Sequence, residues 1–180
     1  MTQTGPAKMS LIHRYFNVIN FAIYQAALLL ALFYQHSAVN LMLVLLLMHF
    51  LLSPSRQQDM RFMLLALIGA TVDQVLVAIN VLAVDNGIIP FYLVLLWCAL
   101  ALTFNHSLRW ITTLRPFYIM LTGFISGPLS YYAALKTGAL ETHISTASYV
   151  VTYALVWLVL LPLLSHLAQV ITYDHRISHE

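Results

Sequence analysis

One acidic residue, Asp73, lies inside a long apolar run, in the stretch GATVDQVLVAIN at residues 69–80. A charged side chain at the centre of a bilayer costs on the order of 3 kcal/mol. We expect no basic residue at the same depth, so Asp73 should keep its proton and donate a hydrogen bond. Gln25, Ser130 and Tyr131 are the candidate partners, because each falls at a similar depth in its own apolar run. Asp73 then has one of three roles. It makes a structural hydrogen bond between helices, it belongs to a site for a lipid, substrate or proton, or it faces lipid without a role.

The same stretch carries two further residues on the side that holds Asp73. Gly69, Asp73 and Asn80 are separated by four and seven residues, which places them on one face of a helix. Gly69 allows a neighbour to approach closely, and a polar face in lipid must turn toward other helices. The spacing predicts that this face looks into a helical bundle.

A second unusual region is FYIMLTGFISGPLSYYAALKTGAL at residues 117–140. Gly123 and Gly127 form a G-x-x-x-G pair, which allows close packing of two helices. Pro128 removes a backbone donor and frees the carbonyl four residues earlier, so we expect a kink. Together with Tyr131, these residues indicate either tight packing alone or the wall of a pocket. A pocket is possible because irregular backbone inside a membrane is tolerated where it lines a cavity.

Three histidines, His49, His106 and His166, each lie about one turn inside the same end of their apolar runs. Three imidazoles at one depth suit a metal ion, and two suit a haem. None of the three belongs to an H-x-x-x-H or H-x-x-E-H pattern, and no carboxylate lies beside these residues in the sequence. Cys98 is the only cysteine, which excludes a thiolate cluster within one chain. We therefore predict no cofactor, with a metal or haem as the alternative.

Polar and cationic residues follow the fourth apolar run. Thr103, His106 and Trp110 are three and four residues apart and lead to Arg109 and Arg115. On a continuing helix the first three would share one face. We expect that face and the two arginines to meet the phosphate of a lipid headgroup.

Composition places these residues in a membrane. The chain is 61% hydrophobic and 8% charged, with a mean hydropathy of +0.84, whereas a soluble globular domain is about 25% charged. The net charge of +2 gives no reason to invoke nucleic acid. Membrane lipids are the expected partners, together with a second copy of the chain or another membrane protein.

Six apolar stretches approach the length of about 20 residues that a spanning helix needs. Short segments rich in Pro, Gly, Asn and charge separate them. We predict an all-α, six-helix transmembrane bundle that forms a single domain over residues 1–180, with tails at 1–14 and 172–180. The predicted spans are 15–34, 38–53, 62–84, 88–108, 116–136 and 148–171.

The basic residues give this bundle a direction. Lys136 alone falls on one side of the predicted membrane. Basic residues near the ends of spans favour the cytoplasmic side, so we predict an inner-membrane protein with both termini in the cytoplasm. The basic residues on the side of the N-terminus are Lys8, Arg14, Arg56, Arg61, Arg109, Arg115 and Arg176.

The order of these landmarks resembles a known family. NFAIYQ at 20–25, Asp73, LW at 96–97, LTFNHSLRW at 102–110 and GFISGPLSYYAALKTGA at 123–139 resemble the bacterial membrane family catalogued as domain of unknown function 2878. The resemblance covers nearly the whole chain, and its most specific part is the G-x-x-x-G-P-x-x-Y segment. It implies no established activity, but it favours a role linked to lipids.

Four functions fit these residues. We favour a membrane-embedded polar site that binds or processes a lipid or another apolar small molecule. The alternatives are a non-catalytic subunit or assembly factor, a small proton-coupled transporter built from two chains, and a haem or metal oxidoreductase. No motif names a reaction, so the sequence leaves open whether the protein is an enzyme. The ligand-binding candidates are Asn20, Gln25, Asp73, Asn80, His106, Arg109, Trp110, Gly127, Pro128 and Tyr131.

Overall fold

The computed structural model describes the backbone of residues 11–177 and the side chains of residues 15–173. Lys8 and the side chains of Arg14 and Arg176, which the orientation prediction uses, lie outside this part. Apart from one isolated bridge between Ala83 and Glu141, the described backbone contains only helices, turns and loops. The all-α prediction is confirmed.

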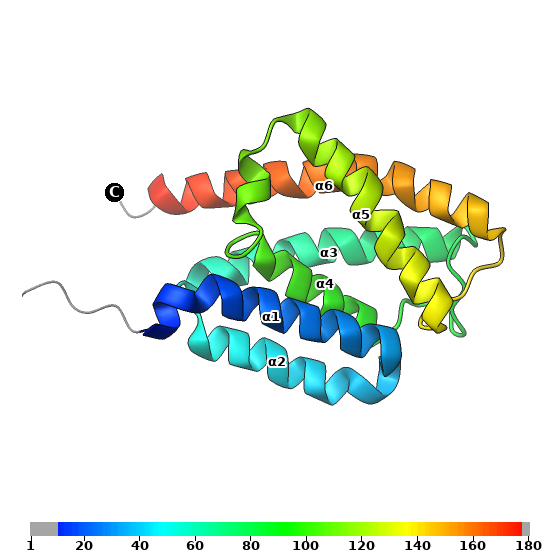
Figure 1. Cartoon of the computed structure of the whole chain (residues 1–180), viewed down its shortest axis with the longest axis horizontal. Helices are drawn as coiled ribbons and strands as arrows, with labels where there is room; N and C mark the ends of the chain where they lie inside the picture. Colours follow the sequence, from blue (N-terminus) through cyan, green and yellow to red (C-terminus); the bar gives the residue numbers. More distant parts are fainter. Residues whose placement is uncertain (1–10, 178–180) are drawn as a thin grey trace, which may run out of the picture.

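Six α-helices and two short 3-10 helices follow one another along the chain (Figure 1). Each α-helix overlaps one of the six apolar stretches predicted as spans. The elements are α1 (Leu11–Phe33), η1 (Gln35–Ala38), α2 (Val39–Leu52), α3 (Arg56–Ala78), α4 (Phe91–Thr103), η2 (Arg109–Thr113), α5 (Pro116–Thr137) and α6 (Thr146–Ile177).

Four helical segments are long and apolar enough to cross a bilayer, which indicates a membrane protein. They are Tyr15–Phe33, Gln35–Leu52, Arg56–Ala78 and Thr146–Tyr173. Helix α4 has only 13 residues, about 20 Å at 1.5 Å per residue, and is shorter than a typical hydrocarbon core. Four spans are therefore supported, and the total of six stays a prediction.

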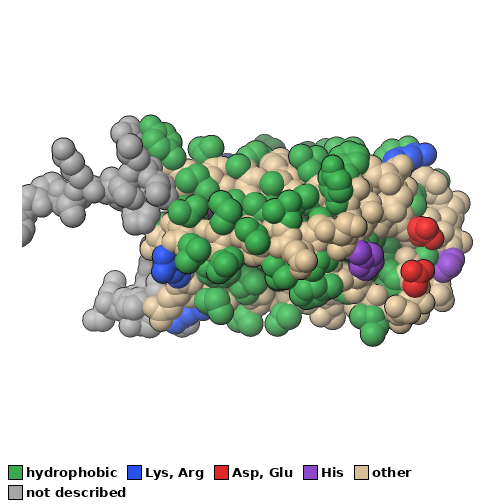
Figure 2. Space-filling view, turned by 90° about the horizontal axis from the view of Figure 1, so that it is seen from below, with side chains coloured by type: hydrophobic (Ala, Val, Ile, Leu, Met, Phe, Trp, Pro, Cys, Tyr) green, Lys and Arg blue, Asp and Glu red, His purple; other side chains and the backbone are tan. Residues whose placement is uncertain are grey.

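Helix α4 lies at the centre of the bundle, where it packs against α1, α2 and α3, while α5 crosses α6 and packs mainly on it (Figure 1). Many large apolar side chains remain on the outside. Figure 2 shows a surface of mostly hydrophobic side chains with acidic side chains gathered at one end. This pattern suits a bundle whose flank faces lipid and whose ends face water.

The end of α3 differs from the predicted span of 62–84. Helix α3 ends at Ala78, and Asn80 adopts φ 60° immediately after it. The Val81 N–H donates to the Leu76 carbonyl, and the Asn80 N–H donates to that of Val77, which is the Schellman arrangement. The prediction that Asn80 continues the polar face of Asp73 is therefore wrong, because Asn80 terminates the helix. Asp73 lies nearer to the end of α3 than to its middle.

Other helix ends also differ from the ends of the predicted spans. Helix α4 ends at Thr103 rather than 108, and the chain turns where the His106 N–H and the Leu108 N–H both donate to the Thr103 carbonyl. Helix α1 begins at Leu11, and α6 continues to Ile177, so the predicted tails are partly helical. Irregular backbone at the end of α4 is tolerated because protein surrounds it.

Glycines set the closest contacts between helices. A Cβ atom at Gly127 would lie 2.0 Å from Cγ of Trp157, and one at Gly123 would lie 2.3 Å from the Trp157 carbonyl oxygen. The predicted G-x-x-x-G contact is thus confirmed, with α6 as the partner, and α5 runs through Pro128 without a break. Gly69 likewise allows close contact between α3 and α4, since a Cβ atom there would lie 2.1 Å from the Trp97 ring.

Gly127→Val should therefore push α6 away from α5. We expect a loss of about 1–3 kcal/mol in the free energy of unfolding, because the added side chain overpacks the contact. The measurement is the unfolding midpoint in detergent. Ser126→Val is the matched control, since Ser126 is exposed on the outer face of α5. Equal midpoints for the two variants would contradict the close contact.

Candidate functional site

The carboxyl group of Asp73 is buried, with 1% of the residue exposed, and it accepts hydrogen bonds from two other helices. Trp97 Nε1 on α4 donates to Oδ2 at 2.6 Å, and the Tyr131 hydroxyl on α5 lies 2.7 Å from Oδ1 and 2.8 Å from Oδ2. An indole N–H can only donate, so Asp73 acts as an acceptor toward Trp97. The carboxyl group ties α3, α4 and α5 together.

Of the three predicted partners of Asp73, one is present. Tyr131 makes the bond, whereas the Ser130 hydroxyl donates to the Ser126 carbonyl at 3.0 Å. Gln25 is half-buried on α1 and makes no hydrogen bond to Asp73 among the described residues. Trp97 was missed as a partner, although α3 and α4 are consecutive helices and both residues lie less than two turns from the loop that joins them.

Aromatic rings extend from Asp73 into the core. Trp97 stacks on Trp157 with ring centroids 5.6 Å apart and planes 12° apart, and Tyr131 stacks on Tyr153 at 3.7 Å. Each tryptophan also lies against a glycine of the helix that faces it. Such stacked pairs contribute about 0.5–1.5 kcal/mol beyond their burial, so these rings have fixed positions.

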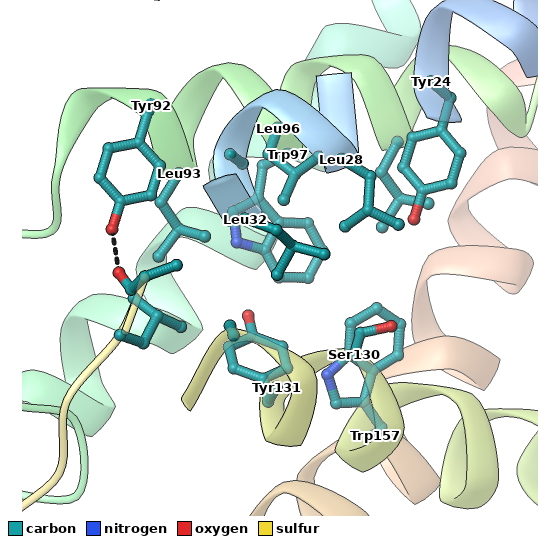
Figure 3. Close-up of a pocket in the computed structure, with 15 residues that line it drawn as sticks. Tyr24, Leu28, Leu32, Tyr92, Leu93, Leu96, Trp97, Ser130, Tyr131 and Trp157 are labelled. Atoms are coloured by element: carbon teal, nitrogen blue, oxygen red, sulfur yellow. Dashed lines mark hydrogen bonds between the residues drawn. The ribbon is translucent and has the colours of Figure 1, made fainter. Parts of the chain in front are cut away.

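A cavity of about 70 Å³ lies beside this aromatic cluster, between α1, α4, α5 and α6 (Figure 3). Tyr131 and Trp157 lie on one side of it, and Trp97 lies on the other side with leucines of α1 and α4. Asp73 does not line the cavity, but Trp97 and Tyr131 both donate to it. The lining residues are Tyr24, Leu28, Ala31, Leu32, Tyr92, Leu93, Leu96, Trp97, Leu100, Ser130, Tyr131, Ala134, Ala139, Leu140 and Trp157.

Three hydroxyl groups at the cavity are already used within the protein. Tyr92 donates to the Ala139 carbonyl, Ser130 to the Ser126 carbonyl, and Tyr131 to Asp73. Tyr24 differs, because its hydroxyl has no hydrogen-bond partner among the described residues, and Figure 3 shows its ring at the edge of the cavity. Tyr24 is therefore a hydroxyl group at this cavity that can bond to a ligand.

A second polar cluster lies at the start of α3, centred on Asp59. Two donors approach Oδ2, namely His49 Nε2 at 3.1 Å and the Ser53 hydroxyl. Two more approach Oδ1, namely Asn105 Nδ2 at 2.7 Å and His106 Nε2 at 2.7 Å. Four donors fill the lone-pair sites of an ionised carboxylate. His49 and Asp59 are 0% exposed and His106 is 9% exposed, so the cluster is enclosed by protein.

Asn20 on α1 extends this cluster to a further helix. Its Nδ2 lies 3.3 Å from Nδ1 of His49, and its Oδ1 accepts from the Ser107 N–H at 3.2 Å and from the Ser107 hydroxyl at 2.5 Å. The cluster thus joins α1, α2, α3 and the turn after α4. Asp59 was overlooked in the sequence, because residue 59 falls outside the predicted third span and was assigned to a loop.

The remaining predicted residues do not converge on either cluster. His166 is exposed on α6 and does not join His49 and His106. Thr103 is buried and Trp110 is 55% exposed, so the expected shared face of Thr103, His106 and Trp110 does not form, because α4 ends at Thr103. Arg109 and His166 instead line an open groove of about 670 Å³ between η2 and α6.

Residues 17–163 match the model of a family described as a protein of unknown function, DUF2878.

The chain belongs to the DUF2878 family. The match spans both polar clusters and the aromatic residues of the cavity, from Asn20 to Trp157. No curated protein and no solved structure matches the chain.

Tyr131→Phe should destabilise this DUF2878 protein by about 1–3 kcal/mol, because Asp73 would lose a buried hydrogen-bond partner. The measurements are the unfolding midpoint in detergent and the tryptophan emission, since Trp97 shares the same carboxyl group. The control is Tyr132→Phe, because Tyr132 is 38% exposed on the other side of α5. A midpoint unchanged by Tyr131→Phe would show that the bond contributes nothing.

Proposed function

We propose that this protein binds a narrow apolar molecule, such as the end of an acyl chain, inside the bilayer. The observation that carries the proposal is the cavity between α1, α4, α5 and α6, whose lining is mainly leucine and aromatic. Ligand sites in proteins are typically apolar clefts with a few fixed polar groups, often between the helices of a bundle. The Tyr24 hydroxyl would supply the polar contact at the cavity edge.

The size of the cavity limits the ligand. A volume of about 70 Å³ is far below the roughly 300–1,000 Å³ of sites for drug-sized molecules. One water molecule takes about 30 Å³ of liquid, so only a thin molecule or one end of a longer one fits. An acyl chain has this shape, and lipid surrounds the outer face of α1 and α5.

Asp73 would act as a positioning residue in this proposal. Its carboxyl group accepts hydrogen bonds from Trp97 and Tyr131, which both line the cavity. Gly127 would support the wall that contains Trp157, because Trp157 packs directly against it. The apolar lining favours binding.

We further propose the inner membrane as the location, with both termini in the cytoplasm. Arg56 and Arg61 lie in the first two turns of α3, Arg109 begins η2 and Arg115 directly precedes α5, whereas Asp85 lies in the loop between α3 and α4. The excess of positive charge on one side supports this direction.

Binding can be followed by fluorescence of the tryptophans at the cavity. In a Trp110→Phe background, emission comes from Trp97 and Trp157, which both line the cavity. A fatty acid brominated at the end of its chain should quench this emission in lipid nanodiscs, with saturation at one molecule per chain. Quenching that rises without saturation would contradict a defined site.

Variants of α1 provide the matched test of position. Leu28→Phe and Leu32→Phe should each weaken saturable quenching at least tenfold, because both leucines line the cavity and a larger side chain fills it. Leu29→Phe should leave quenching unchanged, since Leu29 is 55% exposed toward lipid. If the brominated fatty acid bound all three variants with equal affinity, its binding site would lie outside this cavity.

Orientation can be tested with single cysteines in a Cys98→Ser background. Glu141→Cys should react with a membrane-impermeant maleimide added to intact bacterial cells with a permeable outer membrane. Arg115→Cys should react only after the inner membrane is opened. Labelling in the reverse order would overturn the proposed direction.

A further inference from the structure

The cluster of His49, Asp59 and His106 has the composition of a metal site. We propose that these three residues bind one divalent transition-metal ion of the zinc type. Two imidazole nitrogens and a carboxylate are a common ligand set for zinc and for non-haem iron. The proposal is independent of the cavity near Asp73, because the two carboxyl groups are fourteen residues apart on α3, about 21 Å along its axis.

The distances between the ligand atoms suit one ion. One ligand atom from each residue lies within 4.8 Å of the other two. The pairs with Asp59 are closer, at 3.1 Å for His49 Nε2 and 2.7 Å for His106 Nε2. Bonds of 2.0–2.1 Å in a tetrahedral zinc site hold neighbouring ligand atoms about 3.3 Å apart, so small side-chain shifts would make room for the ion.

The residues around the ligands have the roles expected of a second layer. Histidine ligands commonly donate their other ring N–H to a fixed acceptor, and carboxylate ligands accept further hydrogen bonds. Asn20 lies 3.3 Å from Nδ1 of His49, and Asn105 donates to Oδ1 of Asp59 at 2.7 Å. With a metal on Nε2, the His49 proton would move to Nδ1, and the Asn20 amide would turn so that Oδ1 accepts it.

That turn has an identifiable cost within the cluster. Asn20 Oδ1 now accepts from the backbone N–H and the hydroxyl of Ser107. After the turn, Asn20 Nδ2 would donate to the Ser107 hydroxyl oxygen, and the Ser107 N–H would lose its acceptor. The three metal–ligand bonds would replace this hydrogen bond together with those from His49 and His106 to Asp59.

The position of the cluster favours a structural ion. The ligands come from the end of α2, the start of α3 and the turn after α4, and protein encloses them. Structural zinc sites are enclosed, four-coordinate and contribute directly to folding, so an ion held here would take a fourth ligand, such as water, besides these three side chains. The ion would hold the irregular end of α4 against the α2–α3 hairpin.

The test is metal content and Co²⁺ binding by the full chain purified in detergent. Wild-type protein stripped with a chelator should bind one Co²⁺ per chain, with the visible absorption of a tetrahedral ion, and Zn²⁺ should displace it. Zn²⁺ should also raise the unfolding midpoint. Wild-type protein that binds no stoichiometric Co²⁺ or Zn²⁺ would overturn the proposal.

Matched glutamine variants separate coordination from folding. His106→Gln keeps an N–H group that can donate to Asp59 but removes the metal-ligating nitrogen, so Co²⁺ affinity should fall at least 100-fold while the stripped protein still unfolds cooperatively. His166→Gln should bind Co²⁺ like the wild type, because His166 is exposed on α6. Equal Co²⁺ binding by both variants would also overturn the proposal.

Discussion

A carboxyl group buried in an apolar bundle must find donors, and this requirement organises the structure. Helix α3 carries two such groups, Asp59 in its first turn and Asp73 near its end. Asp59 takes donors from α2 and the turn after α4, and Asp73 takes them from α4 and α5. Removing one partner of a buried charged group is strongly destabilising, so the donors must be present together.

Two fixed points on one helix also determine its register. If α3 moved by one turn along its axis, both carboxyl groups would leave their donors at the same time. Apolar side chains alone would tolerate such a shift, because one leucine-rich face packs much like another. The polar clusters therefore select one arrangement among several that the hydrophobic pattern allows.

The sequence predicted the helices well and the ends of helices poorly. Apolar runs of about 20 residues identify a buried helix, and G-x-x-x-G at Gly123 and Gly127 identifies a close contact, since both depend on local composition. The end of α3 at Ala78 depends on Asn80 adopting a left-handed conformation, and nothing in the apolar pattern signals it. Tyr131 was predicted from depth, while Trp97 was not considered because an indole is usually read as apolar. Asp59 was missed because it lies just before the predicted third span, in a segment that was assigned to a loop.

The contact of each cavity tryptophan with a glycine links two positions that are far apart in the sequence. Trp157 fills the space that Gly127 leaves, and Trp97 fills the space at Gly69. A smaller residue at either tryptophan would enlarge the cavity and leave room for a larger residue at its glycine. A change at both positions of a pair together would therefore alter the volume of the cavity while preserving the spacing of the helices.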